Sequence, residues 1–149
     1  MYGTIVGWRA YALARGDNKP TEAADSIATA ALTRASDYIR FRYVANLLPG
    51  YGVDFTPAGY PLPLVEEATY IAASFELATP GFFSKTYTSS EQKVLTEVKG
   101  IKWSVTGNSS RTYAAMPAST LIEALFEPYI TDPDASGFLL LSIGSRGCS

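Results

Sequence analysis

The sequence predicts a mainly α fold, a small bundle of about four helices with one β-hairpin and an extended C-terminal tail. Four segments carry apolar residues at helical spacing, and a segment between the third and the fourth alternates apolar and polar residues with period two. The chain has 149 residues, and its hydrophobic fraction of 47% is typical of one folded domain. Its charged fraction of 17% is below the usual quarter or so, which favours a surface partly covered by partners. We expect a helical domain over residues 1–130, with the hairpin inserted at about 92–106, and a tail over 131–149.

The first helix is expected from about Ile5 to Arg15. Thr4 is the candidate N-cap, because its hydroxyl can accept a hydrogen bond from the first turn. Gly16 is the candidate C-terminal stop. One face of this helix carries Ile5, Trp8, Ala12 and Arg15, while Val6, Ala10 and Leu13 widen the apolar surface.

The second helix is expected to follow a turn at residues 17–20, to start near Thr21 or Asp25, and to extend to about Tyr43. Its inner stripe is rich in alanine, so a neighbouring helix can approach closely. The inner stripe is Ala28, Ala31, Leu32, Ala35 and Ile39, and the positions expected to face away are Thr29, Thr33, Ser36, Asp37 and Arg40.

A proline- and glycine-rich loop is expected over residues 48–63, where proline at high density excludes a regular helix. Tyr51, Phe55 and Tyr60 lie within it, so we expect the loop to pack on something. Long loops of this kind commonly bind partners, and packing over the chain's own core is an equal alternative.

The third helix is expected from about Leu64 to Ala78, with Glu66 and Glu67 complementing the dipole in its first turn. The alternating segment at 92–106, which contains Trp103, predicts the β-hairpin around a turn at residues 99–100. A fourth helix is expected over about 118–129. The tail carries the apolar run Phe138, Leu139, Leu140 and Leu141, which can pair within the chain or with a partner.

Composition argues against most catalytic and metal sites. The chain has no histidine, and its one cysteine, Cys148, lies beside the C-terminus. Glu66 and Glu67 are adjacent on a helix and therefore diverge, and Asp132 with Asp134 lacks the further carboxylates of a calcium loop. We expect no enzyme activity, no metal and no cofactor. The longest apolar run is too short to span a bilayer, so no membrane partner is expected.

Charge argues against DNA affinity as the main task, because the net charge is −2 and nucleic-acid binders are usually basic. Arg34, Arg40 and Arg42 do lie among aromatic residues, a pattern that suits stacking on single-stranded DNA. The alternative is an amphipathic helix end with extended arginines, in which Tyr38 and Arg42 lie on the inner side.

Several segments occur in a familiar order: Tyr2, Gly3 and Thr4 before residues 10–17, then residues 30–39, 63–70 and 78–81, then residues 93–105 around Gly100. This order resembles a family of small tailed-phage head–tail connector proteins, the adaptor or head-completion proteins. Many members of that family are labelled DnaT-like single-stranded DNA-binding proteins.

The resemblance implies a structural virion protein at the neck, made in the host cytoplasm and assembled as a ring, commonly of twelve copies, under the portal protein. Such a ring extends the channel for genome ejection, joins the head to a tail, stopper or tail-terminator protein, and lets double-stranded DNA pass without specific binding. The runner-up function is single-stranded DNA binding in phage replication. The residues proposed for partner contacts are Tyr51, Phe55, Tyr60, Trp103, Phe138, Leu139, Leu140 and Leu141.

Overall fold

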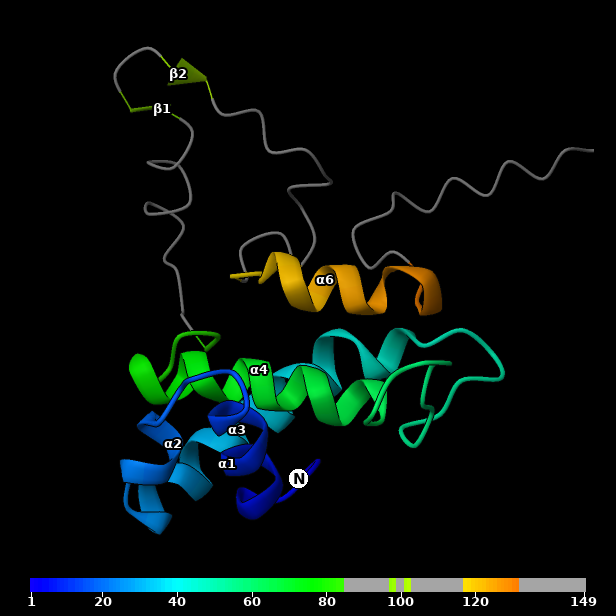
Figure 1. Ribbon diagram of the computed structural model, residues 1–149. Helices are drawn as coiled ribbons and strands as arrows, with labels where there is room; N and C mark the ends of the chain where they lie inside the picture. The colour runs from blue at the N-terminus through cyan, green and yellow to red at the C-terminus, as the bar shows by residue number, and fades with distance from the viewer. Residues whose placement is uncertain (85–96, 99–100, 103–116, 132–149) are drawn as a thin grey trace, which may run out of the picture.

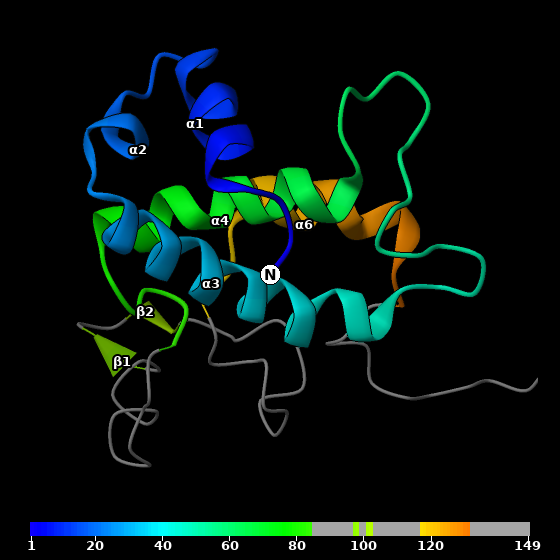
Figure 2. The same ribbon diagram turned by 90° about the horizontal axis from the view of Figure 1, so that it is seen from below.

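A computed structural model describes residues 1–84, 97–98, 101–102 and 117–131 of the chain, and these residues are mainly helical. The helices are α1 (Ile5–Leu13), α2 (Lys19–Glu22), α3 (Asp25–Arg42), α4 (Leu64–Ala78) and α6 (Thr120–Phe126), with 3-10 turns η1 (Val44–Asn46) and η3 (Glu127–Tyr129). The α3–α4 pair forms the centre of the bundle. Figure 1 shows α6 on one side of this pair and α1 and α2 on the other, and Figure 2 shows the same bundle from below.

The hairpin and the tail were also predicted. Two short strands, β1 (Glu97–Val98) and β2 (Ile101–Lys102), pair antiparallel, with Glu97 opposite Lys102. The other residues of the predicted 92–106 hairpin, Trp103 among them, lie outside the described residues. So do residues 132–149, and both elements remain predictions.

The first helix follows its expected capping pattern. Thr4 is the N-cap of α1, and its hydroxyl oxygen accepts a hydrogen bond from the Gly7 N–H at 3.0 Å. Gly16 has φ +78°, the left-handed conformation that favours glycine. The helix ends two residues before the predicted Arg15, at Leu13.

The second predicted helix is divided into α2 and α3. Ala23 and Ala24 are extended between them, and α2 begins at Lys19, inside the predicted turn. The guanidinium of Arg9 explains the break: it donates to the carbonyl oxygens of Pro20 and Ala23, each at 2.8 Å, and pairs with Asp25 at 2.8 Å. A side chain from α1 therefore satisfies carbonyls that a continuous helix would have used.

One position of α3 was predicted on the wrong face. Ser36 is buried, and its hydroxyl oxygen accepts a hydrogen bond from the Tyr2 N–H at 2.7 Å. The inner stripe is buried as expected, and so are Tyr38 and Arg42. The N-terminal segment before α1 therefore packs on α3, a contact that sequence periodicity alone does not indicate.

The α4 helix has its predicted bounds and is held by the carboxylate of Glu76, which is fully buried. Oε2 of Glu76 accepts from Arg34 Nε at 2.7 Å and from the Gly81 N–H at 2.8 Å. Oε1 accepts from the Phe83 N–H at 3.0 Å. One carboxylate thus joins α3, α4 and the chain that leaves α4.

A second ionic cluster attaches α6. Oε1 of Glu123 accepts hydrogen bonds from the Arg42 guanidinium at 2.8 Å and from the Tyr43 hydroxyl at 2.6 Å. The rings of Tyr43 and Phe126 stack at 4.4 Å between centroids. The predicted fourth helix is shorter than expected, because α6 ends at Phe126 and η3 continues to Tyr129.

We expect Glu76→Gln to lower the free energy of unfolding by about 2–4 kcal/mol. The amide keeps the volume of the side chain but loses the charge. One carboxylate oxygen that accepts a hydrogen bond is replaced by an NH₂ group, which is itself a donor and would face another donor. Urea denaturation followed by circular dichroism measures the change. Glu22→Gln, at an exposed position of α2, is the matched control. Equal midpoints for the two variants would contradict this role of Glu76.

We also expect Gly7→Ala to destabilise the chain by about 1–2 kcal/mol, although alanine is the better helix former. A methyl group at position 7 would overlap the hydroxyl of Tyr70, which accepts a hydrogen bond from Thr4 at 3.1 Å and donates one to Glu66 at 2.6 Å. Thermal denaturation measures the effect. Gly52→Ala is the control, because nothing lies within 4 Å of a methyl group there. A Gly7→Ala chain as stable as the parent would show that α1 does not need this close approach.

Candidate functional site

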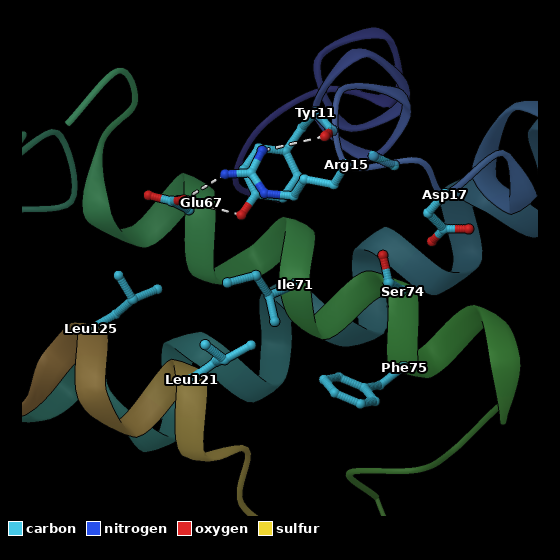
Figure 3. Close-up of a pocket in the computed structure, with 10 residues that line it drawn as sticks. Tyr11, Arg15, Asp17, Glu67, Ile71, Ser74, Phe75, Leu121 and Leu125 are labelled. Atoms are coloured by element: carbon cyan, nitrogen blue, oxygen red, sulfur yellow. Dashed lines mark hydrogen bonds and ion pairs between the residues drawn. The ribbon is translucent and has the colours of Figure 1, made fainter.

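The candidate functional site is a groove of about 400 Å³ on the outer edge of α4, with α1 and α6 as its two walls. Figure 3 shows it from outside. Its apolar part comes from two helices at helical spacing: Ile71 and Phe75 on α4, Leu121 and Leu125 on α6. Each pair is four residues apart and so faces the same way. Ile122 and Phe126 of α6 point into the core instead.

The apolar part of the groove is open to solvent. Leu121 is 63% exposed and Phe75 is 38% exposed, although both belong to helices that pack on each other. Exposed leucine and phenylalanine on neighbouring helices leave apolar area in contact with water. Burying this area would contribute about 25 cal/mol of stabilising free energy per Å². The groove is thus suited to an apolar side chain or segment.

One end of the groove is polar and centres on Glu67. Its Oε1 accepts hydrogen bonds from the Tyr11 hydroxyl at 3.0 Å and from Arg15 at 3.3 Å. The Arg15 guanidinium also lies 3.5 Å from the centre of the Tyr11 ring. Oε2 of Glu67 is buried with no hydrogen-bond partner among the described residues. These contacts fix α1 against the first turns of α4 at the groove wall.

The phenol of Tyr11 is held in its neutral form. Burial, then the negative charge of Glu67 and the hydrogen bond to it, raises the pKa of Tyr11 to about 12, against an opposing effect of Arg15. A neutral phenol that donates to a carboxylate positions the wall but is not a base at neutral pH. In the described part of the chain no group of three acidic or cysteine side chains could hold a metal ion.

The structure describes three of the eight residues proposed for partner contacts. Tyr51 and Phe55 pack within the chain, with ring centroids 4.6 Å apart and each about 5 Å from Tyr129, at 5.2 and 5.1 Å. For Tyr51 and Phe55 the structure therefore supports the alternative, in which the loop packs over the core of its own chain. Tyr60, in the same loop, is exposed. Trp103, Phe138, Leu139, Leu140 and Leu141 lie outside the described residues.

The arginines of the DNA-binding alternative all form ion pairs with carboxylates of the same chain. Arg34 pairs with the buried Glu76, and Arg42 is itself buried and pairs with Glu123. Arg40 is exposed and pairs with Asp37 on the same helix at 2.9 Å. Arg9 and Arg15 are also ion-paired, so each of the five arginines in residues 1–84 has a carboxylate partner.

The groove was not found by sequence reasoning. Glu67 was interpreted only as helix N-terminal charge, and no role in binding was predicted for Ile71 or Phe75. The signal present in the sequence was the repeat of apolar pairs four residues apart, at 71 and 75 and at 121 and 125. Which faces would meet depends on how α6 is attached, and that depends on Arg42 and Glu123, 81 residues apart.

Comparisons with models of known protein families, with curated proteins and with solved structures gave no match. No helix in the described ranges is long and apolar enough to cross a membrane. The function must therefore be argued from the exposed surfaces and their chemistry.

We expect the stability of the chain to fall between pH 10 and about pH 12, partly through Tyr11. Its pKa is higher in the folded chain than the ordinary value of 10.0, so the unfolded chain loses the proton first as the pH rises. The contribution of Tyr11 is fully present below pH 10 and is lost above it.

In Tyr11→Phe this loss should become smaller by about 1 kcal/mol, a value reduced for the partial exposure of the ring. Urea denaturation at a series of pH values measures it. A profile identical to that of the parent chain would mean that Tyr11 ionises as freely in the folded chain as in the unfolded one.

Proposed function

We propose that the chain is a structural subunit of a tailed-phage neck, a head–tail adaptor that assembles with its copies as a ring under the portal protein. The order of segments that resembles the connector family supports this proposal, and so does the predominantly helical bundle. In this proposal the ring extends the DNA channel and presents a surface to the tail or stopper protein. The chain does no chemistry.

The observation that carries the proposal is the surface of α1. The helix is apolar around its whole circumference, and Arg9 is its one charged residue. Trp8 and Ala12 are buried in the core, but Val6 is 78% exposed and Leu13 is 58% exposed on the other side. A helix that is apolar all round is normally buried on all sides. The outer face of α1 therefore has the character of a subunit contact.

The positions of this outer face form one stripe. Val6, Ala10 and Leu13 follow the spacing of four and then three residues, and all three are exposed. The inner side of α1 is fixed by Trp8 in the core and by Arg9 at the corner of α2 and α3. A rigid helix that presents an apolar stripe suits a repeated contact between identical subunits.

The distribution of charge favours a conduit over a DNA-binding protein. The arginines of residues 1–84 are all paired with carboxylates, so few free cations remain there to hold phosphates. DNA that leaves the head must slide, and many phosphate contacts would retard it. The single-stranded DNA alternative depends on Arg34, Arg40 and Arg42. Each of them is paired with a carboxylate and Arg42 is buried, so this alternative has correspondingly less support.

We expect Val6→Glu combined with Leu13→Glu to abolish ring assembly while the chain stays folded. Both side chains are exposed, so the charges cost little in the monomer but would be buried without partners against the neighbouring subunit of the ring. Electron microscopy and sedimentation velocity of the purified chain mixed with portal measure assembly. The matched control is Val53→Glu, an exposed apolar residue of the 48–63 loop.

Two results would count against the adaptor. One is a parent chain that stays monomeric both alone and with portal, in virions whose neck shows no such ring. The other is normal assembly by the double variant, which would remove α1 from the contact.

A further inference from the structure

The groove between α1, α4 and α6 has an apolar floor without a cover among the described residues. Leu121, Leu125, Ile71 and Phe75 form this floor, and none of them is buried. The chain itself contains an apolar segment with no place in the described fold: Phe138, Leu139, Leu140, Leu141 and, after one serine, Ile143. Apolar area on both sides favours their association.

The described chain ends close to the groove. The N–H of Thr131 donates to the carbonyl of Asn46 at 3.0 Å, and Leu47 pairs with Ile130. Thr131 is thereby held at the end of η3, just beyond α6. Leu125 lies six residues earlier, and because η3 ends at Tyr129 and Ile130 is extended, the path spans at most about 14 Å. The tail therefore starts within about 14 Å of one end of the groove floor.

The sequence after Thr131 is suited to turning back. Asp132, Pro133 and Asp134 are residues that favour turns, and Gly137 precedes the apolar run. The five residues 132–136 can span about 17 Å when extended. This length allows the chain to reverse its direction and still bring Phe138 above Leu125.

We propose that residues 137–144 lie in the groove of their own chain and cover its floor. The same chain is the favoured source, because a tether this short gives a high effective concentration that a second copy must exceed. The segment enters beside Leu125 and Glu67 and runs toward Phe75 and Asp17, which lie at the opposite end of the groove in Figure 3.

The charges fit this direction. Arg146 follows the apolar run by three residues and is the one charged residue after Asp134. Asp17 lines the end of the groove that the segment reaches last, and its carboxylate accepts a hydrogen bond from the backbone N–H of Lys19 at 3.1 Å. An apolar segment followed by a cation thus meets an apolar floor followed by an acid.

The test uses the single cysteine. A nitroxide on Cys148 of the full-length ¹⁵N-labelled chain should broaden the amide signals of residues 71–75 on α4 and of Asp17 in NMR spectra. A second sample mixes unlabelled, nitroxide-bearing chains with ¹⁵N-labelled Cys148→Ser chains, and reports only tails from other copies. We expect the groove signals to lose most of their intensity in the first sample and none in the second.

Substitutions in the tail and in the groove distinguish binding of the tail in the groove from a chance approach of the tail to it. Leu140→Asp changes only the tail and Leu121→Asp only the groove floor, and each should restore the signals. Val53→Asp, in the 48–63 loop, should leave the broadening intact. Unbroadened signals in the first sample overturn the proposal, as does broadening in the mixed sample, which assigns the groove to another copy's tail. Broadening that survives Leu140→Asp in a folded chain also overturns it.

Discussion

The buried carboxylate of Glu76 is the interaction on which the rest of the described structure depends. Glu76 accepts hydrogen bonds from Arg34 on α3 and from the two backbone N–H groups of Gly81 and Phe83. A buried charge is tolerated only when it is paired and hydrogen-bonded, and here both oxygens have donors. Because this contact fixes α4 against α3, it also fixes the outer edge of α4, which is the floor of the groove.

The use of arginines in ion pairs within the chain also affects the composition of the surface. Arginines that could have faced solvent instead join elements: Arg9 holds the corner between α2 and α3, and Arg42 holds α6 through Glu123. With so much of the small charged fraction used internally, the outer faces of α1 and α6 present Val6, Leu13 and Leu121. Surfaces of this composition are typical of contacts with other protein. Internal ion pairing and external apolar stripes are thus two results of one distribution of residues.

Sequence patterns predicted the elements whose causes are local. Residues 64–78 follow Pro63 with unbroken helical spacing, and α4 has the predicted bounds. The break at Ala23 and Ala24 was missed because its cause is Arg9, a residue of a different helix. The groove was missed for a similar reason: its two apolar pairs lie on helices separated by more than forty residues, and only the attachment of α6 brings them together. Local chemistry thus predicts where helices can form, whereas contacts between distant residues determine where one is interrupted and which faces meet.

The close contact between α1 and α4 makes the groove wall rigid. Gly7 of α1 lies against the hydroxyl of Tyr70, so the two helices approach more closely there than a side chain on α1 would allow. That hydroxyl is itself fixed by Thr4 and Glu66, and Tyr11 is fixed by Glu67 four residues further along the wall. Contacts at both Gly7 and Tyr11 hold α1 against α4 in an arrangement that leaves Leu121 and Phe75 exposed. An apolar segment that enters the groove would bury this floor without any movement of the helices, which is what the proposed position of residues 137–144 requires.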